Sequence, residues 1–205
     1  VSVIHVERRA VLFRRPQQLV VSESLRCHIP RTPPTAFIKV LLVLSDNFLK
    51  SGWLLRHMHV YEPSEDTFLL RDNLPPHLEG MKVLEVGSGS GAVSVEAARR
   101  GADVVAVDVN PSAVQATRKA AYDAHVTVVA CEGDLYEPVD DERFDLILCN
   151  PPYLPDEPKD PDVSVDGGPQ GWEVIDRLLA GAKDHLTPEG KVLLIFSSHS
   201  KPDKV

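Results

Sequence analysis

Apolar runs recur along the second part of the chain, and each has the length of one buried strand. Amphipathic stretches that predict helices separate them, beginning near Ala92, Ser112 and Trp172. Strands that are apolar on both faces and alternate with helices are typical of a mostly parallel sheet covered on both sides. We therefore predict an α/β, doubly wound fold. Its strands are expected at Lys82–Val86, Asp103–Val107, Val126–Cys131, Phe144–Cys149 and Lys191–Phe196.

A further helix is predicted ahead of the first of these strands. Ser64 is suited to cap its N-terminus, and Glu65 and Asp66 favour its first turn, where a carboxylate meets the positive end of the helix dipole. Pro75 and Pro76 cannot continue a helix, so we expect it to end before them.

The segment VLEVGSGSG, residues 83–91, predicts a strand that leads through a glycine turn into a helix. Gly87, Gly89 and Gly91 allow the main chain to turn tightly and to approach a ligand closely. Asp108 directly follows the next predicted strand, 17 residues after Gly91. That is close to the interval of about 20 at which an acidic residue binds ribose hydroxyls. The glycine pattern alone suits a dinucleotide equally well.

The element Asn150-Pro151-Pro152-Tyr153, directly after an apolar run, indicates a reaction type. A planar NH2 group is a poor nucleophile because its lone pair is delocalised, so it has to be held and polarised. The Asn amide offers one acceptor and two donors in a plane, the Pro151 carbonyl adds an acceptor, and Tyr153 supplies a flat face. These groups together suit the binding of an NH2 group. The structural alternative is a proline-rich turn that ends a buried strand.

A long acidic loop follows from Leu154 to Gly171 and contains four prolines. Loops of that length beside an active site often serve as a lid or as a substrate-binding surface. Trp172, just after it, is expected to pack the next helix.

Several of these stretches together resemble the HemK-like class I S-adenosylmethionine methyltransferases, in particular the shorter archaeal and eukaryotic branch. The resemblance covers about Val60 to Phe196 and implies a Rossmann-like fold. It leaves residues 1–57 as an N-terminal extension before a methyltransferase domain at 58–205, and relatives continue beyond the last strand where this chain stops. The matching stretches are residues 61–68, 85–91, 108–111, 133–135 and 150–153, with Gly167, Gly168 and Gly171.

The resemblance implies S-adenosylmethionine as the cofactor and a role for each matching residue. Asn150 and the Pro151 carbonyl hold the acceptor NH2, with Pro152 and Tyr153 completing the catalytic element. Asn150 also borders the cofactor. Structural alternatives remain for three residues, because Thr67 can stabilise its helix, Glu85 can order the loop and Asp134 can cap a turn. The implied cofactor contacts are Thr67, Glu85, Gly87 and Gly89 at the methionine end, Asp108 at the ribose, Asp134 at the adenine amino group and Leu135 on the ring.

Three kinds of acceptor remain open. The resemblance implies the Gln of the Gly-Gly-Gln loop in a translation release factor. Adenine in a nucleic acid presents a similar planar amine, and a protein lysine is a further possibility within this branch. A cofactor-binding scaffold without activity would require an incomplete site, and the element around Asn150 is complete.

Charge divides the chain in two. Residues 1–57 hold nine Lys and Arg against three Asp and Glu, a net charge of +6, whereas residues 58–205 hold 13 against 27, a net charge of −14. The acidic part suits either adaptation to high salt or an ordinary cytosolic surface, and it argues against strong autonomous binding to nucleic acid. No apolar stretch reaches the roughly 18 residues of a membrane span, so we expect a cytoplasmic protein.

A partner is also implied by the resemblance. The branch depends on a small zinc-binding activator subunit, and Val126–Cys131 is expected to be the outer strand of a sheet with strand order 3-2-1-4-5. An exposed apolar outer strand promotes aggregation, because its main-chain N–H and C=O groups are unpaired. We therefore expect it to pair with a strand of the partner. The alternative is that a helix or loop of this chain covers it. No metal is expected in this chain, because Cys27, Cys131 and Cys149 form no CxxC pair.

Overall fold

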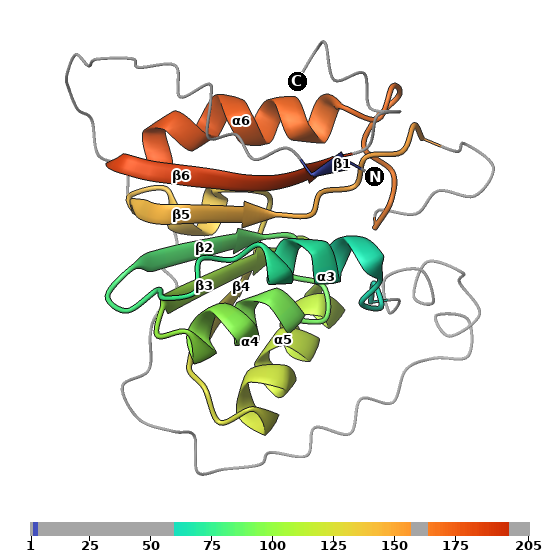
Figure 1. Ribbon diagram of the computed structural model, residues 1–205. Coiled ribbons are helices and arrows are strands. Elements are labelled where there is room, and N and C mark those ends of the chain that lie inside the picture. Colours follow the sequence, from blue (N-terminus) through green and yellow to red (C-terminus); the bar gives the residue numbers. More distant parts are fainter. Residues whose placement is uncertain (1, 4–59, 157–163, 197–205) are drawn as a thin grey trace, which may run out of the picture.

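The computed structural model describes residues 2–3, 60–156 and 164–196, and these form one sheet with helices on both faces (Figure 1). The strand order is β1-β6-β5-β2-β3-β4, in which neighbouring strands from β6 to β4 run parallel and β1 is antiparallel to β6. The predicted order is therefore confirmed. The strands are β1 (Ser2–Val3), β2 (Lys82–Val86), β3 (Asp103–Asp108), β4 (Val128–Glu132), β5 (Phe144–Cys149) and β6 (Leu186–Phe196).

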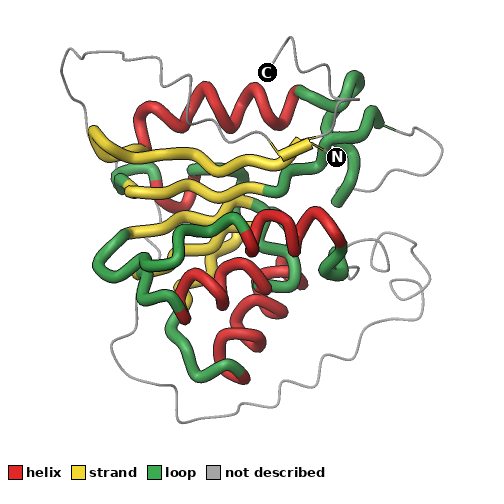
Figure 2. Tube along the Cα trace, in the orientation of Figure 1, coloured by secondary structure: helices red, strands yellow, loops and turns green. Residues whose placement is uncertain are grey.

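Helices cover the two faces of this sheet unequally (Figure 2). Helices α3, α4 and α5 lie on one face, and α6 lies on the other together with the short 3-10 helix η1 (Figure 1). This arrangement confirms the predicted doubly wound α/β class. The bounds are α3 (Glu65–Asp72), α4 (Ala92–Arg99), α5 (Pro111–Asp123), η1 (Glu137–Val139) and α6 (Glu173–His185).

Successive residues of the central strands supply two separate cores. Val83 of β2 packs with Leu70 of α3 and Val93 of α4, whereas the next residue, Leu84, packs with Ile175 of α6 on the opposite face. All five are buried. Because side chains alternate across a strand, a run that is apolar at most positions is what a sheet covered on both faces requires. The two cores fix the sheet rigidly enough to present the carboxyl ends of its strands as a site.

The last strand begins earlier than predicted. The sequence predicted Lys191 as its start, but β6 begins at Leu186, which pairs with Phe144 of β5. The register then shifts, so that regular pairing resumes between Leu146 and Lys191. Pro188 and Gly190 between these points give the sequence the pattern of a turn. The pairing of Leu186 with Phe144 depends on the tertiary contact between β6 and β5, and the local sequence pattern does not predict it.

Smaller boundary differences occur elsewhere. The third predicted strand, Val126–Cys131, is displaced to Val128–Glu132, and β3 extends by one residue to include Asp108. Ser64 does occupy the N-cap of α3, but its side chain makes no capping hydrogen bond. Its Oγ donates to the carboxylate of Asp66. Ser64 therefore has the predicted N-cap position, but its side chain does not make the hydrogen bond that a capping residue makes.

The outer strand β4 has main-chain groups that face away from β3. Gly133 donates its N–H to the Asp108 carbonyl at 3.1 Å, and main-chain groups alternate sides along a strand. Cys131 and Val129 therefore face β3, whereas Ala130 and Val128 face outward. Arg118 of α5 donates to the Ala130 carbonyl at 2.5 Å. One outward acceptor is thus satisfied from within the chain.

Most of the predicted N-terminal extension, residues 1–57, lies outside the described residues. Ser2 and Val3 are described, and they pair with Phe196 and Ile195 along the outer edge of β6. Within the part of the chain that the structure describes, no helix is long and apolar enough to cross a membrane.

Candidate functional site

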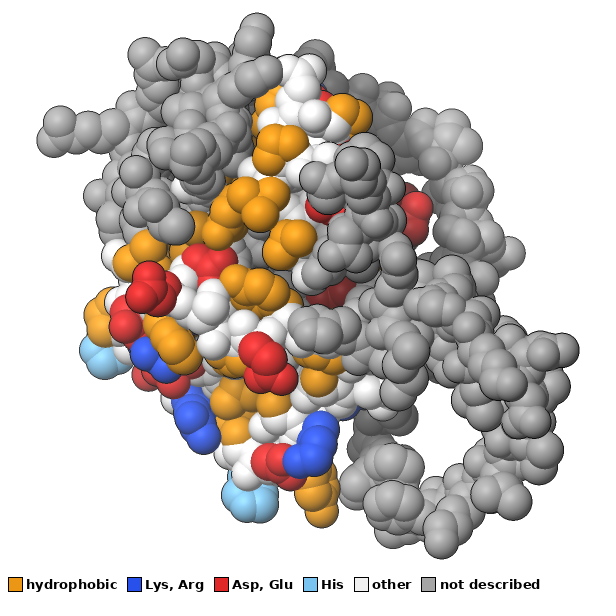
Figure 3. Space-filling view, turned by 90° about the vertical axis from the view of Figure 1, so that its right-hand side faces the viewer, with side chains coloured by type: hydrophobic (Ala, Val, Ile, Leu, Met, Phe, Trp, Pro, Cys, Tyr) orange, Lys and Arg blue, Asp and Glu red, His pale blue; other side chains and the backbone are white. Residues whose placement is uncertain are grey.

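A cavity of about 960 Å³ opens at the carboxyl ends of β2, β3 and β5. Figure 3 views this side of the molecule, where hydrophobic side chains form a band interrupted by acidic ones. Open parallel sheets bind ligands at this edge. The structure places every predicted site residue in the wall of this one cavity: Thr67, Glu85, Gly87, Gly89, Asp108, Asp134, Leu135, Asn150, Pro151, Pro152 and Tyr153.

The glycine loop between β2 and α4 leaves open space where side chains would stand. A Cβ built on Gly87 would meet nothing closer than the Asn150 carbonyl oxygen at 3.9 Å, and one on Gly89 nothing closer than the Tyr61 carbonyl oxygen at 3.8 Å. Both glycines line the cavity. The loop therefore gives a ligand direct access to bare main chain.

Gly91 has a different role from the other two. Its φ is +79°, and a Cβ there would lie 2.7 Å from the Cα of Thr117 in α5. This close approach lets α4 begin directly under the loop, so Gly91 is required for packing between helices.

Asp108 closes the glycine loop against the end of β3. Its Oδ2 accepts the Gly89 N–H at 2.9 Å, and its Oδ1 accepts the Asn110 N–H at 2.8 Å. Burial raises the pKa of Asp108, and these two hydrogen bonds oppose that rise. Each carboxylate oxygen keeps a further lone pair, which suits a vicinal diol.

Glu85 lies deeper in the cavity wall and is 3% exposed. Ser94 of α4 donates its hydroxyl to the carboxyl group. Burial raises the pKa of Glu85 to about 8, with the Ser94 hydrogen bonds opposing and the Asp108 charge reinforcing the rise. A positively charged ligand group at this place would favour the ionised form.

Asp134 and Leu135 approach the cavity from the loop after β4. The Asp134 carboxylate forms an ion pair with Arg177 of α6, and Arg177 also lines the cavity. Leu135 has a φ of +51° and packs against the core between the sheet and α6. The ion pair was not predicted, because it joins elements distant in sequence.

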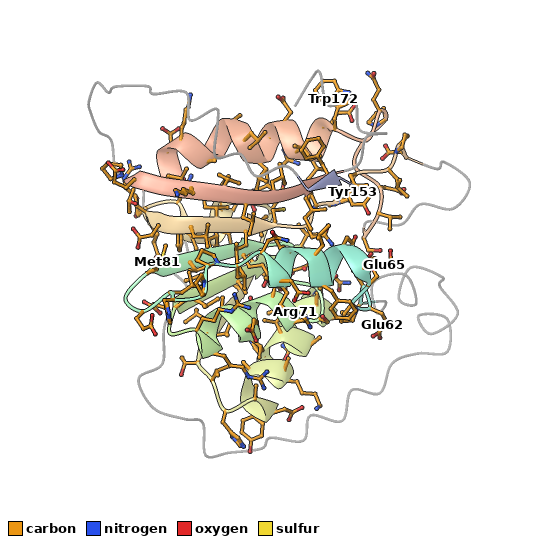
Figure 4. The ribbon with its side chains drawn as sticks, in the orientation of Figure 1. Glu62, Glu65, Arg71, Met81, Tyr153 and Trp172 are labelled. Atoms are coloured by element: carbon orange, nitrogen blue, oxygen red, sulfur yellow. The ribbon has the colours of Figure 1, made fainter. Side chains whose placement is uncertain are left out.

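The predicted NH2-binding element follows β5. Asn150 lines the cavity, yet its Oδ1 is buried and has no hydrogen-bond partner. Tyr153 donates its hydroxyl to the Asp66 carboxylate at 3.1 Å. Burial, and then the Asp66 charge, raise the pKa of Tyr153 to about 12. In Figure 4 Tyr153 lies on the same side of the molecule as Glu65 at the start of α3, with Trp172 at the start of α6.

Asp66 is a site residue that the sequence interpretation missed. It was expected only to favour the first turn of α3, but it is 5% exposed and lines the cavity. Tyr61, which also lines the cavity, donates its hydroxyl to Asp66 at 3.0 Å. The signal available in the sequence was the position of both residues inside the matching stretch 61–68.

The described part of the acidic loop folds back onto the end of β5. Leu154 donates its N–H to the Val165 carbonyl at 3.0 Å, and Gly167 donates to the Leu154 carbonyl at 2.7 Å. Residues 164–166 and Gly168 line the cavity. The described part of the loop therefore contributes one wall of the cavity, and its role as a lid or substrate-binding surface stays a prediction. Among the described residues, no group of three or more His, Cys, Asp or Glu is placed to hold a metal ion.

Comparison with known proteins identifies the kind of domain. Residues 64–205 match the methyltransferase small domain. A protein of Methanocaldococcus jannaschii, provisionally named a protein N5-glutamine methyltransferase, is 40% identical over 148 residues, which cover 69% of this chain and 74% of that protein.

Two solved structures add information about the fold and its ligands. The E. cuniculi Mtq2-Trm112 complex, described as responsible for methylating the eRF1 translation termination factor, aligns with a TM-score of 0.56 and 32% identity over 71% of this chain and 79% of that one. A T. thermophilus 16S rRNA methyltransferase in complex with AdoMet and guanosine aligns with a TM-score of 0.50 and 27% identity, over 65% of this chain and 34% of that one.

Proposed function

Because the chain belongs to the methyltransferase small-domain family, we propose that it is an S-adenosylmethionine-dependent N-methyltransferase acting on a glutamine side-chain amide in a translation release factor. The observation that carries this proposal is the unpartnered, buried Oδ1 of Asn150 in the cavity wall. A buried acceptor without a donor costs about 1–3 kcal/mol, so a ligand that brings a donor to this oxygen would be favoured. An amide NH2 is such a donor.

The cavity fits the cofactor. Glu85 and Asp108 are buried carboxyl groups along its wall, suited to a cationic amino acid end and to ribose hydroxyls respectively. The bare main chain at Gly87 and Gly89 admits a ligand at close range, beside Thr67. Asp134 and Leu135 would border the adenine. S-adenosylmethionine supplies a methyl group on a sulfonium, which requires neither a metal nor a covalent enzyme intermediate.

The remaining residues hold the acceptor. Asn150 Oδ1 and the Pro151 carbonyl would accept hydrogen bonds from the two N–H groups of an NH2, which leaves the nitrogen lone pair free to point at the methyl donor. Pro152 fixes the main chain here, and Tyr153 would flank the acceptor. No general base is required in the transition state, because the nitrogen can lose its proton after methyl transfer. Positioning accounts for the rate enhancement.

Glutamine is favoured over lysine by the environment of Asn150. A lysine ammonium has to lose a proton before its nitrogen can attack. Asp66, the carboxylate that contacts Tyr153, is already occupied by several donors and is held ionised, which makes it a weak base. Adenine remains the second candidate, since its amine is planar. The net charge of −14 over residues 58–205 opposes binding to nucleic acid.

An acceptor panel tests the function. The purified protein, with and without the small activator subunit, would be incubated with methyl-labelled S-adenosylmethionine. The acceptors would be a release factor, the same factor with Gln→Glu in its Gly-Gly-Gln loop, a lysine-rich histone-like protein and duplex DNA. We expect label only in the unmodified release factor. Label in DNA or in the histone-like protein, with none in the release factor, would refute the glutamine assignment.

We further propose a small zinc-binding activator subunit as partner, with the metal held by that subunit, and a cytoplasmic location. The support is the outward-facing main chain of β4 at the sheet edge and the Mtq2-Trm112 complex found for a similar chain. Val128 and Val129 are only half-buried, and Tyr122 at the end of α5 is 80% exposed. Val128 and Val129 belong to the edge strand itself, which a partner strand can extend.

A further inference from the structure

We propose that Asp66 is a positioning residue that fixes the orientation of the Asn150 amide, so that its oxygen and not its NH2 is presented to the acceptor. This inference rests on the proposed function only for the identity of the acceptor. The geometry of Asp66 itself is independent of that identity.

Asp66 connects two elements that are far apart in the sequence. It is the second residue of α3, and Tyr153, the last residue of the predicted NH2-binding element, donates to its Oδ2 at 3.1 Å. Both residues line the cavity. The segment after β5 is therefore tied to the start of α3 at the point where the acceptor would bind.

Donors surround the Asp66 carboxylate. Its Oδ1 accepts the main-chain N–H of Thr67 at 2.7 Å and the hydroxyl of Ser64, and Tyr61 donates to Oδ2 at 3.0 Å. The side-chain amide of Asn150 also helps to lower the pKa of this carboxylate, so its NH2 lies within reach of Asp66. Each of these contacts draws on an oxygen lone pair, so the group functions only as an acceptor.

The carboxylate also stays charged. Burial by itself would raise the pKa of Asp66, but the hydrogen bonds from Ser64, Asn150, Thr67 and Tyr61 outweigh burial and hold the pKa below its ordinary value. An ionised carboxylate has no proton to donate at any pH near neutrality. The Asp66 carboxylate therefore cannot donate a hydrogen bond to the oxygen of an amide.

The orientation of Asn150 follows from these facts. An amide beside an acceptor-only group has to direct its Nδ2 toward that group, because the opposite orientation would set two oxygens against each other. Oδ1 is then left without a partner inside the protein, and the structure shows this for Asn150. The site consequently offers an acceptor to its substrate. It selects a group with N–H donors and disfavours an acceptor-only group such as a carboxylate.

Substitution of Asp66 by Asn tests the inference. The variant Asp66→Asn keeps the shape of the side chain but adds an NH2, which can donate to Asn150 Oδ1 and stabilise the reversed amide. We expect turnover to fall on the order of 100-fold, as for a misplaced reacting group. The dissociation constant for S-adenosylmethionine, measured by calorimetry, should change less than about threefold. The control is Glu65→Gln, which removes a carboxylate from the exposed neighbouring position on α3 and should leave both values unchanged.

A spectroscopic measurement distinguishes a changed orientation of the Asn150 amide from a general loss of structure in the variant. In the ¹H–¹⁵N spectrum of the unsubstituted protein, assigned with Asn150→Ala, one Nδ2 proton should be shifted downfield and protected from exchange by the charged acceptor. In Asp66→Asn this proton should move toward the position of a solvated asparagine, whereas Glu65→Gln should not move it.

The outcomes distinguish the inference from the proposed function. An unshifted, unprotected Asn150 amide in the unsubstituted protein would overturn the inference even if Asp66→Asn fails to fold. Unchanged turnover in a folded Asp66→Asn variant would overturn it too. If the protein methylates no glutamine acceptor, the proposed function fails, and the amide spectrum still decides the role of Asp66.

Discussion

Gly89 donates its main-chain N–H to the carboxylate of Asp108 at 2.9 Å, which joins the glycine loop after β2 to the end of β3. The residue expected to bind the cofactor ribose therefore also shapes the loop expected to bind the methionine end. The two parts of the cofactor site are consequently coupled.

Asp108→Ala should weaken S-adenosylmethionine binding by at least tenfold, because it removes the ribose acceptor and leaves the Gly89 and Asn110 N–H groups without their partner. We expect a stability loss of about 1–3 kcal/mol with the fold retained. Calorimetric titration and urea unfolding measure the two effects. Asp103→Ala, at the exposed start of the same strand, is the control. Unchanged affinity in Asp108→Ala would show that the cofactor assignment is wrong.

Asn150→Ala should reduce methyl transfer on the order of 100-fold or more, as when a group that positions reacting atoms is removed. Cofactor affinity should change only modestly, because the Asn150 amide is assigned mainly to the acceptor. Single-turnover kinetics and calorimetry on the same preparation separate the two. Near-normal turnover in this variant would exclude Asn150 as the NH2-binding residue.

Cofactor affinity should depend on pH through Glu85, whose pKa burial raises to about 8 from an ordinary 4.5. A cationic ligand favours the ionised carboxylate, so affinity should rise by up to about tenfold per pH unit from pH 6 and level off above about pH 8. Calorimetry from pH 6 to 9 would reveal this, and Glu85→Gln should abolish the dependence. A flat profile in the unsubstituted protein would contradict the assignment.

The stability of the ligand-free protein should show the opposite trend. Since the folded pKa of Glu85 lies above the unfolded value, this group contributes stability below about pH 4.5 that is lost as the pH rises to about 8. The free energy of unfolding of Glu85→Gln should decline less over that range. Urea unfolding at several pH values measures the difference between the two proteins.

Gly91→Ala should destabilise the protein by roughly 2–5 kcal/mol. Its φ of +79° disfavours a side chain by about 1–2 kcal/mol, and the new Cβ would lie 2.7 Å from the Thr117 Cα, which forces α4 and α5 apart. Gly80→Ala is the matched control, since its φ is +75° and no heavy atom lies within 4 Å of the new Cβ. It should cost only about 1–2 kcal/mol. Equal losses in both variants would show that the contact with Thr117 is unimportant.

Val128→Pro should abolish formation of the heterodimer. Val128 faces outward from β3, so proline removes an N–H available to a partner strand without removing a β3–β4 hydrogen bond. Val128→Ala keeps the N–H and should still bind. Co-purification with the activator subunit measures binding, and cofactor binding by the isolated variant verifies its fold. A chain that is monomeric, soluble and fully active without a companion would refute this interface.

The sequence by itself determined the fold class, the strand order and a set of residues that share one cavity. Runs such as Phe144–Cys149 carry enough apolar residues to require burial on both faces, and parallel strands direct their carboxyl ends to one edge. Asp108 and Asn150 follow two such runs, so pattern alone brought them together. The role of each residue in binding stays a prediction.

Only the tertiary structure decided which side chains satisfy one another. Local pattern assigned Ser64 to a helix cap and Asp66 to a first turn, whereas folding brings Tyr153 and Asn150 to the same carboxylate from more than 80 residues away. The start of β6 at Leu186 and the ion pair between Asp134 and Arg177 were also undetermined by pattern. Burial and hydrogen bonding across elements set these contacts and the pKa of Glu85, and a one-dimensional pattern carries no information about distances between elements.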